Sequence, residues 1–162
     1  MNTLQVGDTA PEFSTTAVGG NYGSGARIKL SELKGSPVIL CFYPKDDTPG
    51  CTTQACGIRD SWETIKVRGV HLFGVSTDGE KSHEKFIAKF DLPFPLLADT
   101  DKEIVTAYGV WVEKSMYGKK YMGTERTTFL VDPKGKIAAI LPKVKPAEHA
   151  ELLLKALKDL QG

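Results

Sequence analysis

Two cysteines five residues apart, Cys51 and Cys56, carry the strongest chemical signal in this chain. Cys51 follows Pro49 and Gly50, where a strand is expected to turn into a helix. A thiol there feels the partial positive charge of the helix N-terminus and its free N–H groups, which favours the nucleophilic thiolate. A second thiol nearby can close a disulfide after the first has been oxidised. The spacing therefore predicts redox chemistry at Cys51, with Cys56 as the resolving thiol.

The same spacing imposes a conformational requirement. In a regular helix that starts at Cys51, Cα atoms five residues apart are separated by roughly 8–9 Å, whereas a disulfide needs them within about 7 Å. Cys56 also lies about 140° around the helix axis from Cys51. We therefore expect the first turns of the helix to unwind before the two sulfurs can bond. Gly50 and Gly57 lower the cost of that unwinding.

The residues around Cys51 suit a peroxide substrate. Pro44 and Pro49 stiffen the preceding loop and keep water away from the sulfur. The Thr48 hydroxyl can donate and accept hydrogen bonds, so it can hold a peroxide oxygen beside the thiolate. Arg126 directly precedes an apolar segment, and a strand there could deliver its guanidinium to stabilise the thiolate and the charge that develops on the O–O bond. Spacing along the sequence does not show that Arg126 reaches Cys51.

Simpler roles stay open for two of these residues. Arg126 could form a structural ion pair with Glu125 or Asp132 instead. Thr48 could serve only as a turn residue.

The elements that must position these residues follow an α/β pattern. Short apolar segments bounded by turn residues are typical of buried strands, and apolar residues recur at helical spacing between them. The order predicts a thioredoxin-like fold, a central mixed β-sheet flanked by helices on both faces, with an antiparallel pair at one edge. The predicted strands are Pro37–Tyr43, Val70–Ser76, Thr127–Asp132 and Lys136–Leu141, and the predicted helices start at Cys51, span Glu80–Phe90 and Thr100–Tyr108, and follow Pro146.

Length and composition narrow the class of protein. The 162 residues predict a single domain over 1–162, and 41% hydrophobic and 25% charged residues are ordinary for a globular protein. A net charge of +1 with scattered Lys and Arg indicates neither nucleic acid nor a membrane as partner. The first eight residues lack the basic and apolar parts of a signal peptide, so we expect a cytoplasmic protein. Three cysteines make a poor structural disulfide framework.

The third cysteine and the histidines have ordinary structural interpretations. Cys41 lies within a strand among large apolar residues, where a free cysteine acts as a small hydrophobe. His71, His83 and His149 have no metal-ligand spacing, so no metal site is predicted. His71 is expected in a strand, and His83 and His149 on helix surfaces.

Taken in order, these motifs resemble one enzyme family over almost the whole chain. Pro44, Thr48 and Cys51 match the catalytic pattern of the peroxiredoxins, and Cys56 lies where the bacterioferritin comigratory protein (peroxiredoxin Q) subfamily carries its resolving cysteine. The segments Val6–Phe13, Gly74–Ser76 and Glu125–Asp132 are similar to that subfamily too. Two departures lie outside the motif, a longer loop at Gly19–Ala26 and the extra thiol of Cys41.

The resemblance implies a thiol peroxidase that reduces hydrogen peroxide and alkyl hydroperoxides. Cys51 would be peroxidatic and Cys56 resolving, with Thr48, Pro44 and Arg126 completing the catalytic site. An intramolecular disulfide would be recycled by thioredoxin or a similar dithiol protein. The subfamily implies no cofactor, and a monomer or weak dimer.

Two other functions remain to be distinguished. A thiol–disulfide oxidoreductase would share the fold, but its cysteines normally have two residues between them, and such enzymes resemble one another in carrying a cis-proline where this chain has Arg126. A non-catalytic redox sensor would use the same fold with an unreactive Cys51.

Overall fold

The computed structural model describes residues 4–161, so the ends of the predicted domain lie outside the described residues. Its main sheet has seven strands in the order β2-β1-β5-β4-β3-β8-β9. These strands are β1 (Ser14–Val18), β2 (Ala26–Lys29), β3 (Val38–Phe42), β4 (His71–Ser76), β5 (Leu96–Ala98), β8 (Thr128–Val131) and β9 (Ile137–Leu141).

The sheet is parallel at its centre and antiparallel at both edges. β3 pairs with β4 and β4 with β5 in parallel, whereas β8 runs antiparallel to β3 and β9. At the other edge, β1 pairs antiparallel with β2 and β5. The sheet is therefore mixed as predicted, with one more antiparallel edge than the sequence indicated.

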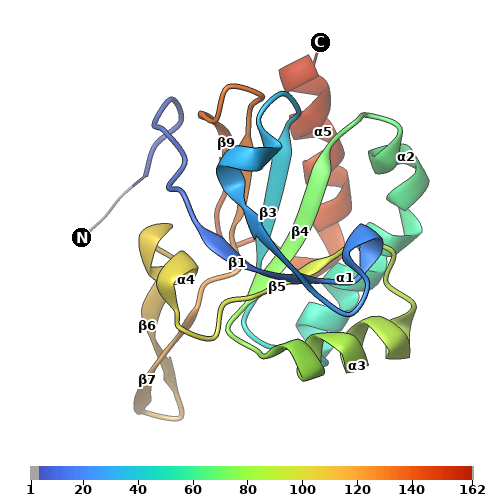
Figure 1. The fold of residues 1–162 in the computed structure, drawn as a ribbon. Coiled ribbons are helices and arrows are strands. Elements are labelled where there is room, and N and C mark those ends of the chain that lie inside the picture. The colour runs from blue at the N-terminus through green and yellow to red at the C-terminus, as the bar shows by residue number, and fades with distance from the viewer. Residues whose placement is uncertain (1–3, 162) are drawn as a thin grey trace.

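Helices cover both faces of the sheet because alternate residues of its strands point to opposite sides. From β3, Ile39 and Cys41 pack in the cluster that contains residues of α1 (Pro49–Asp60), α3 (Glu80–Phe90) and α5 (His149–Gln161). Leu40 and Phe42 pack in the other cluster, with Ile104 and Val105 of α4 (Glu103–Ala107). Figure 1 shows α4 on one side of the sheet and α1, α3 and α5 on the other.

A separate two-stranded sheet, β6 (Trp111–Met116) with β7 (Lys119–Thr124), projects beside α4 (Figure 1). The sequence prediction missed this hairpin, because its residues are mostly polar and exposed and show no buried face. It also missed β1, β2 and the three-residue β5, which are too short or too polar to show an apolar pattern.

The predicted helices are present, and the bounds of most of them differ from the prediction. α1 begins at Pro49, two residues before Cys51, because proline is well suited to the first helical position. α1 ends at Asp60, and the predicted apolar stripe continues in α2 (Trp62–Lys66). α3 has the predicted bounds, whereas α4 is shorter than predicted.

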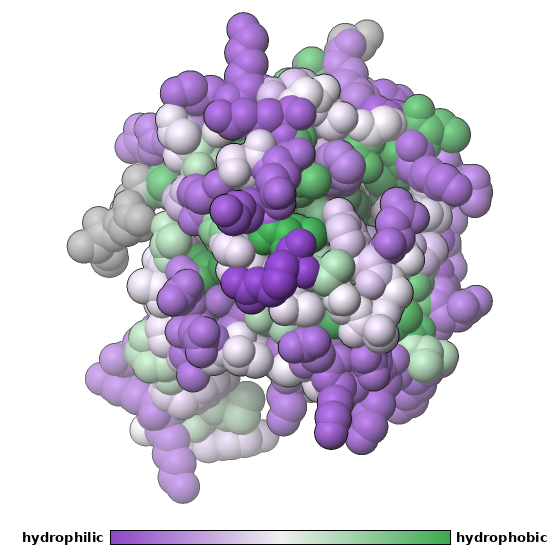
Figure 2. Space-filling view, in the orientation of Figure 1, coloured by the Kyte–Doolittle hydropathy of each residue, from purple (hydrophilic) through white to green (hydrophobic). Residues whose placement is uncertain are grey.

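The apolar residues are largely enclosed between these layers. The face drawn in Figure 2 is mostly hydrophilic, with apolar atoms in small areas between polar side chains. Among residues 4–161, no helix is long and apolar enough to span a bilayer.

Candidate active site

Cys51 occupies the third position of α1. The first hydrogen bond of this helix runs from the Thr52 N–H to the Thr48 carbonyl, at 2.8 Å. The N–H groups of Gly50 and Cys51 precede that bond, where helix geometry supplies them with no carbonyl partner. Cys51 is buried, with only 2% of its surface exposed.

Arg126 reaches Cys51, as the sequence analysis proposed. Its Nη1 donates to Cys51 Sγ at 3.3 Å and to Gln54 Oε1 at 2.5 Å. The Arg126 carbonyl accepts from the Val144 N–H at 2.9 Å, which fixes the backbone just ahead of β8. In a buried site, a guanidinium in contact with sulfur strongly stabilises negative charge there.

The alternative interpretation of Arg126 as a partner of Asp132 does not describe this structure. Asp132 Oδ1 instead accepts from the N–H groups of Lys134 and Lys136, both at 2.9 Å, in the turn between β8 and β9.

Gly50 gives the guanidinium its room. A Cβ on this residue would lie 3.0 Å from Arg126 Nη2, closer than side chains normally pack. The glycine in the motif therefore lets Arg126 lie against the first turn of α1, in addition to any part it plays in unwinding.

Thr48 and Pro44 belong to the loop between β3 and α1, and both are half-buried. The Thr48 hydroxyl donates to the Lys45 carbonyl at 2.9 Å. With its proton engaged there, Thr48 Oγ1 offers its lone pairs to a donor such as the O–H of a hydroperoxide.

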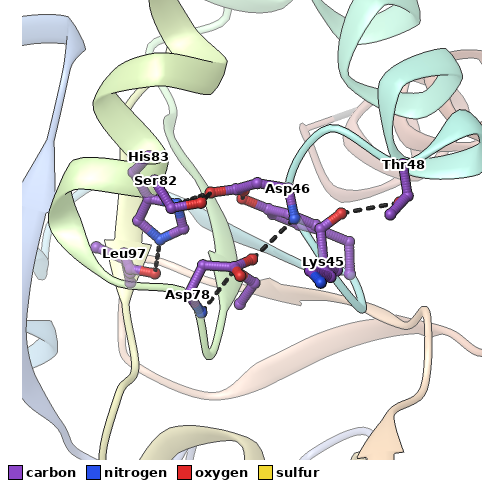
Figure 3. A network of polar contacts seen from close by, with 9 residues as sticks. Lys45, Asp46, Thr48, Asp78, Ser82, His83 and Leu97 are labelled. Carbon is purple, nitrogen blue, oxygen red and sulfur yellow. Dashed lines mark hydrogen bonds and ion pairs between the residues drawn. The ribbon is translucent and has the colours of Figure 1, made fainter.

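A buried polar network fixes this loop (Figure 3). Asp46 accepts hydrogen bonds from the Tyr43 hydroxyl at 2.5 Å and from the Ser82 hydroxyl at 2.8 Å, and its Oδ2 lies 2.7 Å from His83 Nδ1. The Asp46 N–H donates to Asp78 at 2.8 Å. The loop is thus tied to the segment that follows β4 and to the start of α3.

The prediction that His83 lies on a helix surface is wrong. The ring is fully buried, between Asp46 and the Leu97 carbonyl, which is 2.8 Å from Nε2. The helical spacing did not reveal this, because the partner is an acidic residue 37 positions away in the active-site loop.

Cys56 is half-buried in the same uninterrupted helix, and all three cysteines are free. Because α1 is helical from Pro49 to Asp60, the geometric obstacle to a Cys51–Cys56 bond applies to this conformation.

Cys41 is buried within β3, as expected. Burial raises the pKa of its thiol to about 12, and a hydrogen bond with Thr128 acts in the opposite direction. This thiol is therefore protonated at neutral pH and a poor nucleophile.

Sequence reasoning missed three residues around Arg126. Gln54 is buried and accepts from Arg126, and its position three residues after Cys51 could have placed it on the same helix face. Lys114, on β6, donates to the Thr124 carbonyl, and its pKa is lowered by burial and by the charge of Arg126. His149, predicted on a helix surface, is fully buried against Gln54 and Thr128, which corrects that prediction.

Among the described residues 4–161, no three His, Cys, Asp or Glu side chains gather as a metal site would require. What the residues do bring together is a reduced thiol and a cation at a helix N-terminus, on a thioredoxin-like sheet. That arrangement suits attack of sulfur on an O–O bond, and it places the molecule in the class of thiol-dependent peroxidases of thioredoxin-like fold.

Comparison with known proteins identifies the group within this class. The chain belongs to the AhpC/TSA family, whose model matches residues 6–140, and within it to the Bcp or peroxiredoxin Q peroxiredoxins. It is 42% identical to peroxiredoxin Bcp of Bacillus subtilis over 98% of each chain. It is 41% identical to peroxiredoxin Bcp of Escherichia coli, over 98% of this chain and 99% of the relative.

Solved structures agree with this assignment. Peroxiredoxin Q of Xanthomonas campestris superposes with a TM-score of 0.83 at 38% identity, over 91% of this chain and 90% of that one. A Cys-to-Ser variant of Xylella fastidiosa PrxQ superposes with a TM-score of 0.90 at 31% identity over the whole of both chains. The predicted fold class, family and thiol peroxidase activity are confirmed.

Proposed function

We propose that Cys51 is the peroxidatic cysteine of this enzyme and that its substrates are hydrogen peroxide and alkyl hydroperoxides. The contact of 3.3 Å between Arg126 Nη1 and Cys51 Sγ carries the proposal. The thiolate attacks the terminal peroxide oxygen and the O–O bond breaks. Sulfur is oxidised to sulfenic acid, and the other oxygen leaves as water or an alcohol after taking up a proton.

The remaining site residues position and polarise the peroxide. Arg126 and the Cys51 N–H stabilise the charge that builds on the departing oxygen. Thr48 Oγ1, whose own proton is donated to Lys45, accepts the O–H of the hydroperoxide. Pro44 holds the chain at the entrance of the loop.

Cys56 resolves the sulfenic acid. The first turns of α1 unwind, the Cys56 sulfur displaces the hydroxyl of Cys51 sulfenic acid, and a disulfide and water are formed. A dithiol protein such as thioredoxin then reduces this disulfide and is itself oxidised. The scheme runs within one chain, acting as a single domain and needing no cofactor, so a monomer or weak dimer in the cytoplasm suffices.

A relative supports the choice of substrate. Structures of the Xanthomonas campestris bacterioferritin comigratory protein, 37% identical to this chain with a TM-score of 0.84, were determined as intermediate and ligand complexes to explain its alkyl peroxide reduction.

Mass spectrometry of the non-reduced protein after one equivalent of peroxide tests the scheme. We expect a Cys51–Cys56 crosslink in wild type, sulfenic or sulfinic acid on Cys51 in Cys56→Ser, and neither in Cys51→Ser. Sulfinic acid on Cys51 beside a free Cys56 in wild type would assign resolution elsewhere. Insulin reduction at a higher rate than peroxide consumption would favour a thiol–disulfide oxidoreductase.

A further inference from the structure

A buried row of polar side chains links Arg126 to the interior on the α5 side of the sheet. Gln54 Oε1 accepts from Arg126, and Gln54 Nε2 lies 3.2 Å from His149 Nδ1. His149 Nε2 lies 2.7 Å from Thr128 Oγ1. Gln54, His149 and Thr128 are each at most 3% exposed. The half-buried guanidinium of Arg126 is therefore held by a row of three side chains that are themselves shielded from water.

The chemistry of these groups fixes the direction of each hydrogen bond. A guanidinium only donates, so the amide oxygen of Gln54 faces Arg126 and its NH₂ group faces His149. His149 Nδ1 must then accept, and Nε2 carries the ring proton and donates to Thr128. The geometry requires a neutral His149. Burial, aided by the charge of Arg126, lowers the pKa of His149 to about 4, which agrees with that requirement.

We propose that His149 is a positioning residue for Arg126 and a proton-sensitive latch on the first turns of α1. The proposal rests on the function given above, in which these turns must unwind for Cys56 to reach Cys51. In the folded form, neutral His149 holds Gln54, and Gln54 holds Arg126 beside the sulfur.

A proton on His149 is incompatible with this arrangement. Nδ1–H would face the amide N–H groups of Gln54, and turning the amide over would set its NH₂ group against the guanidinium. Unwinding of α1 removes Gln54 from the ring and admits water. The unwound form therefore binds a proton on His149 more readily than the folded form, and acidification favours unwinding.

Few other charges face the ring. Arg126 is the charged group beside it, and Cys41 adjoins Thr128. The ionisable side chains of α1 are Cys51, Cys56, Arg59 and Asp60, and β9 contributes none. Glu148 and Glu151, next to His149 in the sequence, are exposed.

The size of the effect follows from the two environments. If the ring titrates as an ordinary histidine near 6.5 when α1 is unwound and near 4 when it is folded, lowering the pH from 7.5 to 5.5 raises the ratio of unwound to folded protein about tenfold.

An NMR titration of the His149 ring in wild type, reduced and disulfide-bonded, tests the latch directly. The disulfide is made with diamide, so its formation does not depend on peroxidase activity. We expect a neutral Nε2–H ring down to pH 5 in the reduced protein and protonation between pH 6 and 7 in the disulfide form. Identical titrations in the two forms, or no Cys51–Cys56 bond with diamide, would overturn the latch. A bond with diamide but none with peroxide would overturn the peroxidase scheme alone.

Kinetics with a matched variant supply the second test. In His149→Asn, Oδ1 can accept from Gln54 in place of Nδ1 but does not titrate. The wild-type rate of disulfide closure, divided by that of His149→Asn, should rise about tenfold from pH 7.5 to 5.5. Because Cys56 is the same in both proteins, its own titration cancels, and a flat ratio contradicts the latch.

The positioning role has its own readout at pH 7.5. His149→Leu offers Gln54 no acceptor and should slow oxidation of Cys51 by peroxide about tenfold, and His149→Asn should recover most of that rate. Equal rates in the two variants would assign His149 a purely structural role.

Discussion

One buried histidine contacts the loop that precedes Cys51 and another contacts α1, and their hydrogen-bond networks differ in what they join. His83 connects Asp46 of the loop to α3 and to the β5 carbonyl of Leu97. His149 connects Thr128 of β8 to Gln54 of α1. The His83 network therefore joins elements that need not move in the proposed cycle, whereas the His149 network reaches the helix whose first turns we propose to unwind.

The two rings also differ in their partners. His83 lies between two oxygen partners, the Asp46 carboxyl group at Nδ1 and the Leu97 carbonyl at Nε2. His149 faces a donor at Nδ1 and holds only one proton. A ring held by oxygen partners at both nitrogens suits a permanent support, and a neutral ring suits the contact that the proposed unwinding would break.

Replacement of Arg126 should have the largest effect on the rate of peroxide reduction, because this residue joins the His149 network to the Cys51 sulfur. Arg126→Met removes the only cation shown in contact with Cys51 Sγ among the described residues. We expect the second-order rate of peroxide reduction to fall about 10²–10³-fold, the range for loss of one preorganised donor. Stopped-flow measurement checks this. Arg126→Lys should recover part of the rate only, because an ammonium cannot contact sulfur and Gln54 in the same way, and full recovery would contradict the geometry.

Replacement of Asp46 should disrupt the His83 network that holds the loop before α1. Asp46→Asn leaves His83 buried without its charged partner, and we expect a loss of about 3 kcal/mol in the free energy of unfolding. Asp47 next to it is a matched control, because its ion pair with Lys89 is exposed. Asp47→Asn should change stability by less than about 1 kcal/mol. Urea unfolding measures the stability of both variants. Similar losses of stability would show that the buried Asp46 contributes no more than the exposed Asp47.

The His149 network should make the free energy of unfolding depend on pH. An unfolded histidine takes up a proton below about pH 6.5, whereas His149 in the folded protein does so only near 4. Between these values the unfolded state binds more protons, so stability falls as the pH decreases and levels off below 4. The full contribution is about 3 kcal/mol. Urea unfolding from pH 7 to 4 should show this loss in wild type and a smaller one in His149→Asn, and parallel curves would contradict it.

The difference between the two networks also marks how far sequence reasoning could go. Pro44, Thr48 and Cys51 lie within eight residues, so their proximity follows from a local turn, and Arg126 could be placed because it precedes a strand. The buried strands β3 and β4 were evident because all five residues of β3 are apolar and because Leu72, Phe73 and Val75 fill the interior of β4.

The supporting residues were not evident for a physical reason. Gln54 and His149 are 95 positions apart and Asp46 and His83 are 37 apart, so no periodicity connects them. A polar residue on an amphipathic helix ordinarily faces water, and burial of both rings depends on partners that only the folded chain supplies. The polar hairpin β6–β7 and the short β5 were not predicted for a related reason. These strands are defined by their pairing with other strands and not by an apolar pattern in their own residues.

The smallest effect concerns Cys41, at the far end of the His149 network. Its thiol adjoins Thr128, but burial raises its pKa to about 12, so it stays protonated and inaccessible. Iodoacetamide at pH 8 should leave Cys41 unmodified in the folded, reduced protein and label it only in denaturant, as peptide mass spectrometry would show. Cys41→Ala should change the rate of peroxide reduction less than twofold, because the Cys41 thiol has its hydrogen bond with Thr128 and not with Arg126. Rapid labelling of native Cys41 would mean that this end of the network opens to water, and the ring of His149 would then lose the dry environment that keeps it neutral.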